Sequence, residues 1–195
     1  AERVAAALRA PALSALPDLT FPARKDSRYG VSLAQPMYLE LWEVGLARLG
    51  SGEWGAGSGN DLNNWLAALY RVPPPQPEPF ESYLHDFGGA PRTTHHARSS
   101  LSWWSLLEMA PERSGDPSAW RPGSLLLEAQ GLAVLRAEHR YAGLECGAYG
   151  GGHGHADRLH LTLHADGVHW LPDPGTGSYV TRDLFWYHST LAHNA

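Results

Sequence analysis

The spacing of the apolar residues changes once along this chain, and that change constrains the fold more than any other feature. Up to Arg71 the apolar residues recur every three or four positions, which is typical of amphipathic helices. From Ser124 onward they alternate with a period of two, which predicts strands. Helices followed by strands argue against repeated βαβ units. The sequence therefore predicts an α+β fold with an antiparallel sheet.

Three helices are expected in the first part. AERVAAALRA, at residues 1–10, is amphipathic and lacks the unbroken apolar run of a signal peptide. The second helix covers 36–50, with proline at its start and glycine at its end. The third covers 60–71, where Asn60 or Asp61 supplies the N-terminal cap. Trp42 and Trp65 lie on the apolar faces and are expected in the core.

The composition of the connecting segments suggests domain boundaries. A glycine-rich loop at 50–60 has neither the GK[ST] signature nor the preceding strand of a phosphate-binding loop. VPPPQPEP, at 72–79, is typical of an extended polyproline connector. We predict a helical domain over 1–79, a connecting region over 80–123 and an antiparallel sheet domain over 124–195.

The last part of the chain contains five short strand candidates separated by glycine-containing turns, at 124–130, 132–139, 142–149, 158–165 and 168–173. Asp166-Gly167 is the favoured pair for a two-residue hairpin turn. Leucines and polar residues alternate in the fourth segment, so they point to opposite faces. We expect the polar side, with His160, His164 and His169, to face solvent. Trp170 and Trp186 are expected to pack.

Bulk properties exclude several classes of protein. The net charge is -5 and no basic stripe is present, so a nucleic-acid partner is not expected. No apolar run approaches the roughly 18 residues of a membrane span. Cys146 is the single cysteine, which excludes an intrachain disulfide and a cysteine-based zinc site. A periplasmic or secreted location is favoured, with a cytoplasmic one as the alternative, and a homodimer is left open.

Histidines and acids are concentrated near the end of the chain. His153 and His155 are two residues apart, so on an extended segment they project to the same side. His155, Asp173 and His193 are chemically suitable zinc ligands. Their spacing alone does not distinguish a metal site from ordinary sheet histidines, because ligands contributed across a sheet have no fixed sequence separation.

Three ordered blocks carry a resemblance to a known family: HGHAD at 153–157, DPGTGSY at 173–179 and STLAHN at 189–194. The region from Leu132 to Ala195 closely resembles the C-terminal part of the heparinase II/III family of polysaccharide lyases. PARKDSRYG, at 22–30, is similar to the late toroid of that family. The resemblance implies the end of an incomplete α/α toroid followed by the start of a sandwich-type sheet domain, in a fragment of a longer protein.

The resemblance also implies roles for individual residues. His153 would help neutralise a uronate carboxylate, and Tyr179 would be the proton donor or acceptor, with Tyr187 as its competitor. His155, Asp173 and His193 would hold a structural zinc ion. The family normally supplies an Asn-His pair and a further tyrosine from upstream helices, and this sequence has no convincing counterpart.

The implied function is β-elimination on an acidic polysaccharide that contains uronic acid. Heparan sulfate, other glycosaminoglycans, alginate and bacterial exopolysaccharides all remain open as substrates. Arg136 and Arg182 either contact such a sugar or are solvated or salt-bridged. Two alternatives stand beside the lyase: an inactive carbohydrate-binding or structural module of the same fold, and a zinc-dependent hydrolase that uses the same three ligands.

Overall fold

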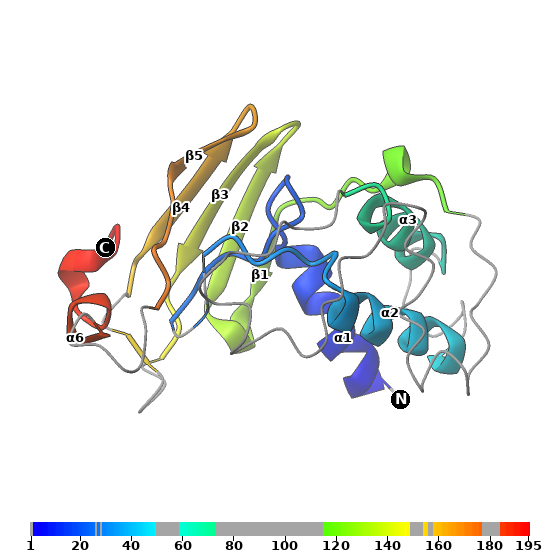
Figure 1. Cartoon of the computed structure of the whole chain (residues 1–195), viewed down its shortest axis with the longest axis horizontal. Helices are drawn as coiled ribbons and strands as arrows, with labels where there is room; N and C mark the ends of the chain where they lie inside the picture. The colour runs from blue at the N-terminus through cyan, green and yellow to red at the C-terminus, as the bar shows by residue number, and fades with distance from the viewer. Residues whose placement is uncertain are drawn as a thin grey trace. The chain divides into compact units, whose positions relative to one another are not determined.

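A computed structural model describes most of the chain as two compact units (Figure 1). The described residues are 2–25, 27, 29–49, 59–72, 115–148, 154–155, 158–176 and 184–195. The first unit comprises Ala1–Leu8 and Ser32–Trp120, and the second comprises Arg9–Val31 and Arg121–Ala195. The glycine-rich loop, the polyproline segment and most of the connecting region lie outside the described residues. The predicted domain boundaries therefore remain predictions.

The helical unit is organised around stacked tryptophans. It contains the start of α1 (Glu2–Ser14), α2 (Pro36–Leu49), α3 (Gly59–Leu69) and the short 3₁₀ helix η1 (Pro117–Ala119). Trp42 and Trp65 are buried, with ring centroids 5.5 Å apart, and Trp120 packs on Trp65 at 5.1 Å. The indole of Trp42 donates to Leu8 O at 3.2 Å, which satisfies its buried N–H. The predicted core positions of Trp42 and Trp65 are confirmed.

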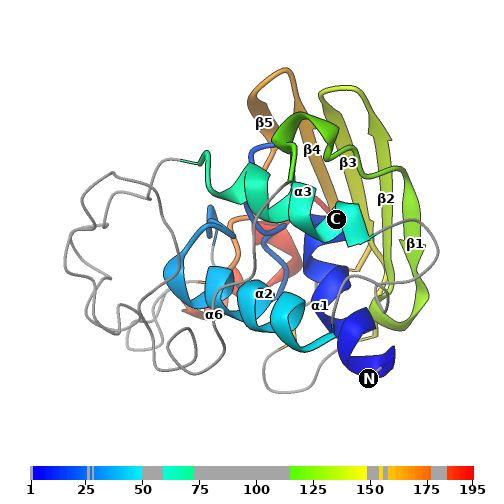
Figure 2. The same cartoon turned by 90° about the vertical axis from the view of Figure 1, so that its right-hand side faces the viewer.

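The sheet unit contains a five-stranded antiparallel sheet in sequential order (Figures 1 and 2). Its strands are β1 (Leu125–Leu127), β2 (Leu132–Ala137), β3 (Arg140–Glu145), β4 (Leu161–Ala165) and β5 (Val168–Leu171). Four of them fall in the predicted segments, whereas β3 begins two residues before the predicted segment 142–149. Asp166 and Gly167 both have positive φ angles, 51° and 82°, as the favoured two-residue hairpin turn requires. The 3₁₀ turn η2 (Glu128–Gln130), α6 (Leu184–Tyr187) and the 3₁₀ turn η4 (Thr190–Ala192) complete this unit.

One face of the sheet is covered by the segment 9–31. Leu16 from that segment forms a buried cluster with Leu132, Val134 and Tyr141. Arg136 donates to the carbonyl oxygens of Leu13 and Ala15, at 2.8 and 2.6 Å, and its guanidinium lies 5.0 Å from the Tyr141 ring centroid. Arg136 therefore holds the covering segment in place and is not available as a sugar contact. Arg182 lies outside the described residues.

A second tie between the same segment and the sheet is an ion pair. The guanidinium of Arg24 pairs with the buried carboxylate of Glu145 and also donates to Gln130 O at 2.8 Å. Gly147 N donates to the other Glu145 oxygen at 3.0 Å. Burial of a carboxylate is tolerated because both oxygens have partners. PARKDSRYG, at 22–30, thus belongs to the sheet unit.

In β4 and the two residues before it, the exposed and buried faces are the reverse of the prediction. His160 and His164 are each 2% exposed, whereas Leu159 is 63% exposed, so the expectation that the histidines face solvent is wrong. The polar face is the one covered by residues 9–31 and by the C-terminal segment. The opposite face leaves apolar side chains exposed: Leu126, Leu135, Leu144, Leu161, Val168 and Trp170. Trp170 and Trp186 are both exposed, so the prediction that they pack is also wrong.

Candidate metal centre

Three chain segments meet at the open end of the β4–β5 hairpin. His160 immediately precedes β4, and Asp173 follows β5 by two residues. Because the two strands are antiparallel, these positions lie at the same end of the hairpin. His193 follows η4 and completes the group. One ligand atom from each of the three buried side chains lies within 4.8 Å of those of the other two.

Asp173 and His193 form the centre of this group. Gly175 N donates to Asp173 Oδ1 at 2.7 Å, and His193 Nδ1 lies 3.0 Å from the same oxygen. His193 Nε2 lies 2.8 Å from Tyr187 O, and a carbonyl only accepts, so Nε2 carries a hydrogen. In the neutral ring Nδ1 then presents a lone pair toward a carboxylate oxygen. A lone pair on His193 Nδ1 and the carboxylate oxygen Asp173 Oδ1 repel each other. Their contact is therefore stabilised either by a second proton on the ring or by a metal cation.

His160 is oriented differently. Its Nδ1 accepts the backbone N–H of Asn194 at 3.0 Å, so its hydrogen resides on Nε2. That Nε2 lies 3.2 Å from Asp173 Oδ2. His160 therefore directs an N–H toward Asp173 rather than a lone pair toward an ion. This arrangement suits a residue that positions the carboxylate.

Asn194 closes the end of the hairpin next to this group. Its side-chain amide donates to Pro172 O at 3.0 Å and to Leu161 O at 3.4 Å, and Leu161 N donates to Asn194 O at 3.1 Å. The C-terminal segment is thereby fastened across the start of β4 and the end of β5. These bonds hold His193 and His160 in place.

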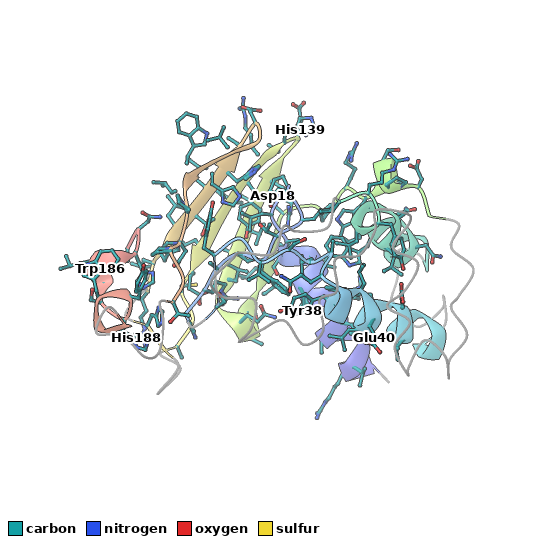
Figure 3. The ribbon with its side chains drawn as sticks, viewed as in Figure 1. Asp18, Tyr38, Glu40, His139, Trp186 and His188 are labelled. Carbon is teal, nitrogen blue, oxygen red and sulfur yellow. The ribbon has the colours of Figure 1, made fainter. Side chains whose placement is uncertain are left out.

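His155 adjoins the group through His193. It is buried, and its Nδ1 lies 3.2 Å from His193 Nε2. Its ring also lies 4.3 Å, centroid to centroid, from that of His188, one residue past α6 (Figure 3). Of the three residues predicted as zinc ligands, Asp173 and His193 are in direct contact and His155 borders them.

The other residues predicted to act in the site are either outside the described residues or in contact with the group through other atoms. His153 and Tyr179, the expected catalytic residues, lie outside the described residues. Tyr187 is described, and the atom it directs to the group is its backbone carbonyl oxygen. His160 was missed as a member of the group, because alternation along the fourth segment does not tell which face is covered. Its place directly before the strand, on the same side as His164, was the available signal.

The donor set fits a divalent metal ion. Asp173 Oδ2 is buried, and its 3.2 Å contact with His160 Nε2 lacks the geometry of a hydrogen bond. An imidazole that ligates a metal usually donates its other N–H to a carbonyl or carboxylate, as His193 does to Tyr187 O. A mixed nitrogen and oxygen set of histidines and aspartate is typical of zinc. The structure thus contains a His/Asp group able to bind a metal.

Comparison with known proteins finds one family model that resembles the region around this group. Residues 121–195 match the family model described as heparinase II/III-like, C-terminal. The matched part of the chain is similar to the C-terminal part of that family. It contains the whole His160, Asp173 and His193 group and all five strands. A search of curated proteins finds no match for the chain.

Solved structures agree on the fold. A heparan sulfate lyase HepC mutant from Pedobacter heparinus superposes with a TM-score of 0.52 at 14% identity, covering 93% of this chain and 21% of that one. A heparinase III gene product with methylated lysines gives 0.54 at 14% identity, covering 94% and 21%. The chain thus spans about one fifth of the length of these heparinases. The predicted α+β fold, helices followed by an antiparallel sheet, is confirmed.

No helix among the described residues is long and apolar enough to cross a membrane.

Proposed function

We propose that this chain is part of a polysaccharide lyase that cleaves an acidic, uronic-acid-containing polysaccharide by β-elimination. The observation that carries the proposal is the buried group of His160, Asp173 and His193 inside the region that matches the heparinase II/III-like family. The fold of the two similar heparinases supports it. The homodimer and the periplasmic or secreted location stay predictions.

The chemistry requires neutralisation of charge next to the bond that breaks. A lyase removes the proton at C5 of a uronate and expels the oxygen linked at C4, which leaves a carbon–carbon double bond. The C5 proton is weakly acidic beside an ionised carboxylate, so positive or hydrogen-bonding groups must stabilise the developing charge. His153 is proposed for that task. Tyr179 is proposed to transfer the proton, which requires a phenol pKa lowered from about 10.

Zinc is proposed in a structural role. Asp173 and His193 would be ligands, and His155 would be the third, while His160 would stay in contact with Asp173 Oδ2. A bound ion would balance the buried charge of the carboxylate and fix the C-terminal segment to the hairpin. Removal of that ion is expected to loosen the C-terminal segment from the hairpin.

The test uses the natural polypeptide that contains these residues, as wild type, Tyr179→Phe and the matched control Tyr187→Phe. Each is incubated with a panel of uronate polymers, and the ultraviolet absorbance of the unsaturated uronate product is followed. The wild type and Tyr187→Phe are expected to produce it, and Tyr179→Phe to lose about 100-fold or more of the rate. Loss in Tyr187→Phe alone would transfer the role to that residue.

Two other outcomes would contradict the proposal. Cleaved chains without a double bond, in a reaction abolished by a chelator, would indicate a zinc-dependent hydrolase. Binding of the polymers without any cleavage would indicate a carbohydrate-binding module.

A further inference from the structure

A second group of metal-ligating side chains lies at the turn end of the β4–β5 hairpin. His164 and His169 are direct cross-strand partners on β4 and β5, and their ring centroids are 4.7 Å apart. The two-residue turn at Asp166-Gly167 sets this register. Both rings point to the covered face of the sheet, where cross-strand neighbours are close enough to share a ligand.

Asp18, from the covering segment and labelled in Figure 3, groups with these two histidines. Its Oδ1 accepts from Thr20 N and Thr20 Oγ1, at 3.1 and 2.7 Å. Its Oδ2 lies 2.9 Å from His169 Nε2. The turn at residues 18–20 thus fixes one carboxylate oxygen and directs the other toward the histidines.

A hydrogen bond between Asp18 and His169 does not explain why a histidine occupies position 164. The residue is buried, and its Nδ1 has no hydrogen-bond partner among the residues that the structure describes. A buried nitrogen without a partner is destabilising, because the water it loses on folding is not replaced. Asp18 and His169 satisfy each other without it, so the pair alone gives no reason for His164 to be histidine.

The three side chains are of types that bind metal ions. Burial lowers the pKa of His164, although nearby Asp18 opposes that effect, so its ring is neutral at pH 7 and has a lone pair. Burial opposes ionisation of Asp18, but the hydrogen bonds from Thr20 and the contact with His169 hold the pKa of this carboxyl below its ordinary value. The group therefore offers two imidazole rings and one carboxylate.

We propose that Asp18, His164 and His169 form a second site for a divalent metal ion of the zinc class. One ligand atom from each lies within 4.8 Å of the others. Ligands of a tetrahedral zinc ion are separated by roughly 3.3 Å, so shortening the separations between ligand atoms by at most about 1.5 Å would close the site. Two imidazoles and one carboxylate favour zinc, cobalt or nickel over calcium and magnesium, which prefer all-oxygen sites.

The two sites are separate. His160 and His164 are four residues apart on an extended segment, which places them about 13 Å apart at roughly 3.3 Å per residue. One ion therefore cannot serve both groups. The second ion would clip the segment 9–31 to the β4–β5 hairpin, and the 40% exposure of the Asp18 side chain would leave a coordination position for water.

The experiment measures metal binding to the 195-residue chain. After treatment with a chelator, the protein is titrated with cobalt(II), and the visible absorption of the bound ion is recorded together with the stoichiometry. Zinc content after dialysis is determined in parallel. The wild type is expected to bind two ions. Asp18→Asn and His169→Gln are each expected to bind one, with at least a tenfold loss of affinity at the second site.

The controls separate this site from the first one. His139→Gln alters an exposed histidine at the β2–β3 turn and is expected to bind two ions (Figure 3). His193→Ala is expected to keep the Asp18 site. Asp18→Asn retains an oxygen acceptor for Thr20, so circular dichroism should show an unchanged fold. Titration curves for Asp18→Asn and His169→Gln that match the wild type would overturn the proposal, whatever the first site binds.

Discussion

At the scale of single residues, the covered face of the sheet contains several buried polar side chains, and some of them hold the covering segment. Tyr141 is the clearest case. Its hydroxyl donates to Ser14 O at 3.2 Å, and burial raises its pKa to about 12, with Arg136 and Arg24 opposing that effect. The neutral phenol is therefore part of the fold, and ionisation disrupts it.

The pH dependence of stability should reveal this phenol. Because the folded state keeps the proton more tightly than the unfolded state, the stability it contributes is present below pH 10 and is lost as the pH rises toward 12. The loss amounts to no more than about 2.7 kcal/mol. Urea unfolding between pH 9 and 12 should show it in the wild type and much less in Tyr141→Phe. Tyr29→Phe, at a half-exposed tyrosine, is the control, and the same slope in all three proteins would refute the assignment.

His160 should behave as a positioning residue. Since it directs an N–H to Asp173, His160→Gln is expected to weaken metal binding at the Asp173 centre by about 10–100-fold without changing the number of ions bound at saturation. His193→Ala should abolish binding there. Isothermal titration with zinc measures both quantities. Complete loss of an ion in His160→Gln would instead make His160 a ligand.

Part of this centre was accessible from the sequence. Asp173 and His193 lie in blocks with a recognisable family pattern, and the structure brings them into contact. His160 was assigned to solvent because a histidine in an alternating strand is usually exposed. The assignment failed because the choice of covered face depends on residues 9–31, which are more than a hundred positions away.

At the scale of elements, the sheet was the most predictable part of the molecule. Period-two alternation, glycine-containing turns and the Asp166-Gly167 pair located all five strands. Alternation defines two faces but does not tell which one the rest of the chain covers. In β4 the leucines occupy the exposed face, so the usual rule of apolar side inward gave the wrong orientation.

Two leucines of β2 test the orientation directly. Leu132 is 2% exposed and Leu135 is 66% exposed, on opposite faces of one strand. Leu132→Ala is expected to reduce the free energy of unfolding by about 2–5 kcal/mol, and Leu135→Ala by about 0.5 kcal/mol or less. Chemical denaturation of the two variants provides the comparison. Equal reductions of the free energy of unfolding, or a larger one for Leu135→Ala, would show that the face we describe as exposed is covered.

At the scale of the whole molecule, the sheet unit takes a segment from the early part of the chain. Residues 9–31 supply Leu16 to the core, Arg24 to the Glu145 ion pair and Asp18 to the second histidine group. No periodicity marks this segment, so its place could not be predicted from the sequence. The segment 9–31 covers the polar face of the sheet, and both candidate metal sites lie on that face.

The account depends most on a cation at the Asp173 centre. We would crystallise the zinc-loaded chain and collect diffraction data on both sides of the zinc absorption edge. The account predicts an anomalous peak bonded to Asp173 and His193, with His160 Nε2 in contact with the free carboxylate oxygen. No peak there, with a protonated His193 bonded directly to Asp173, would contradict it and leave a buried ion pair in place of the metal centre.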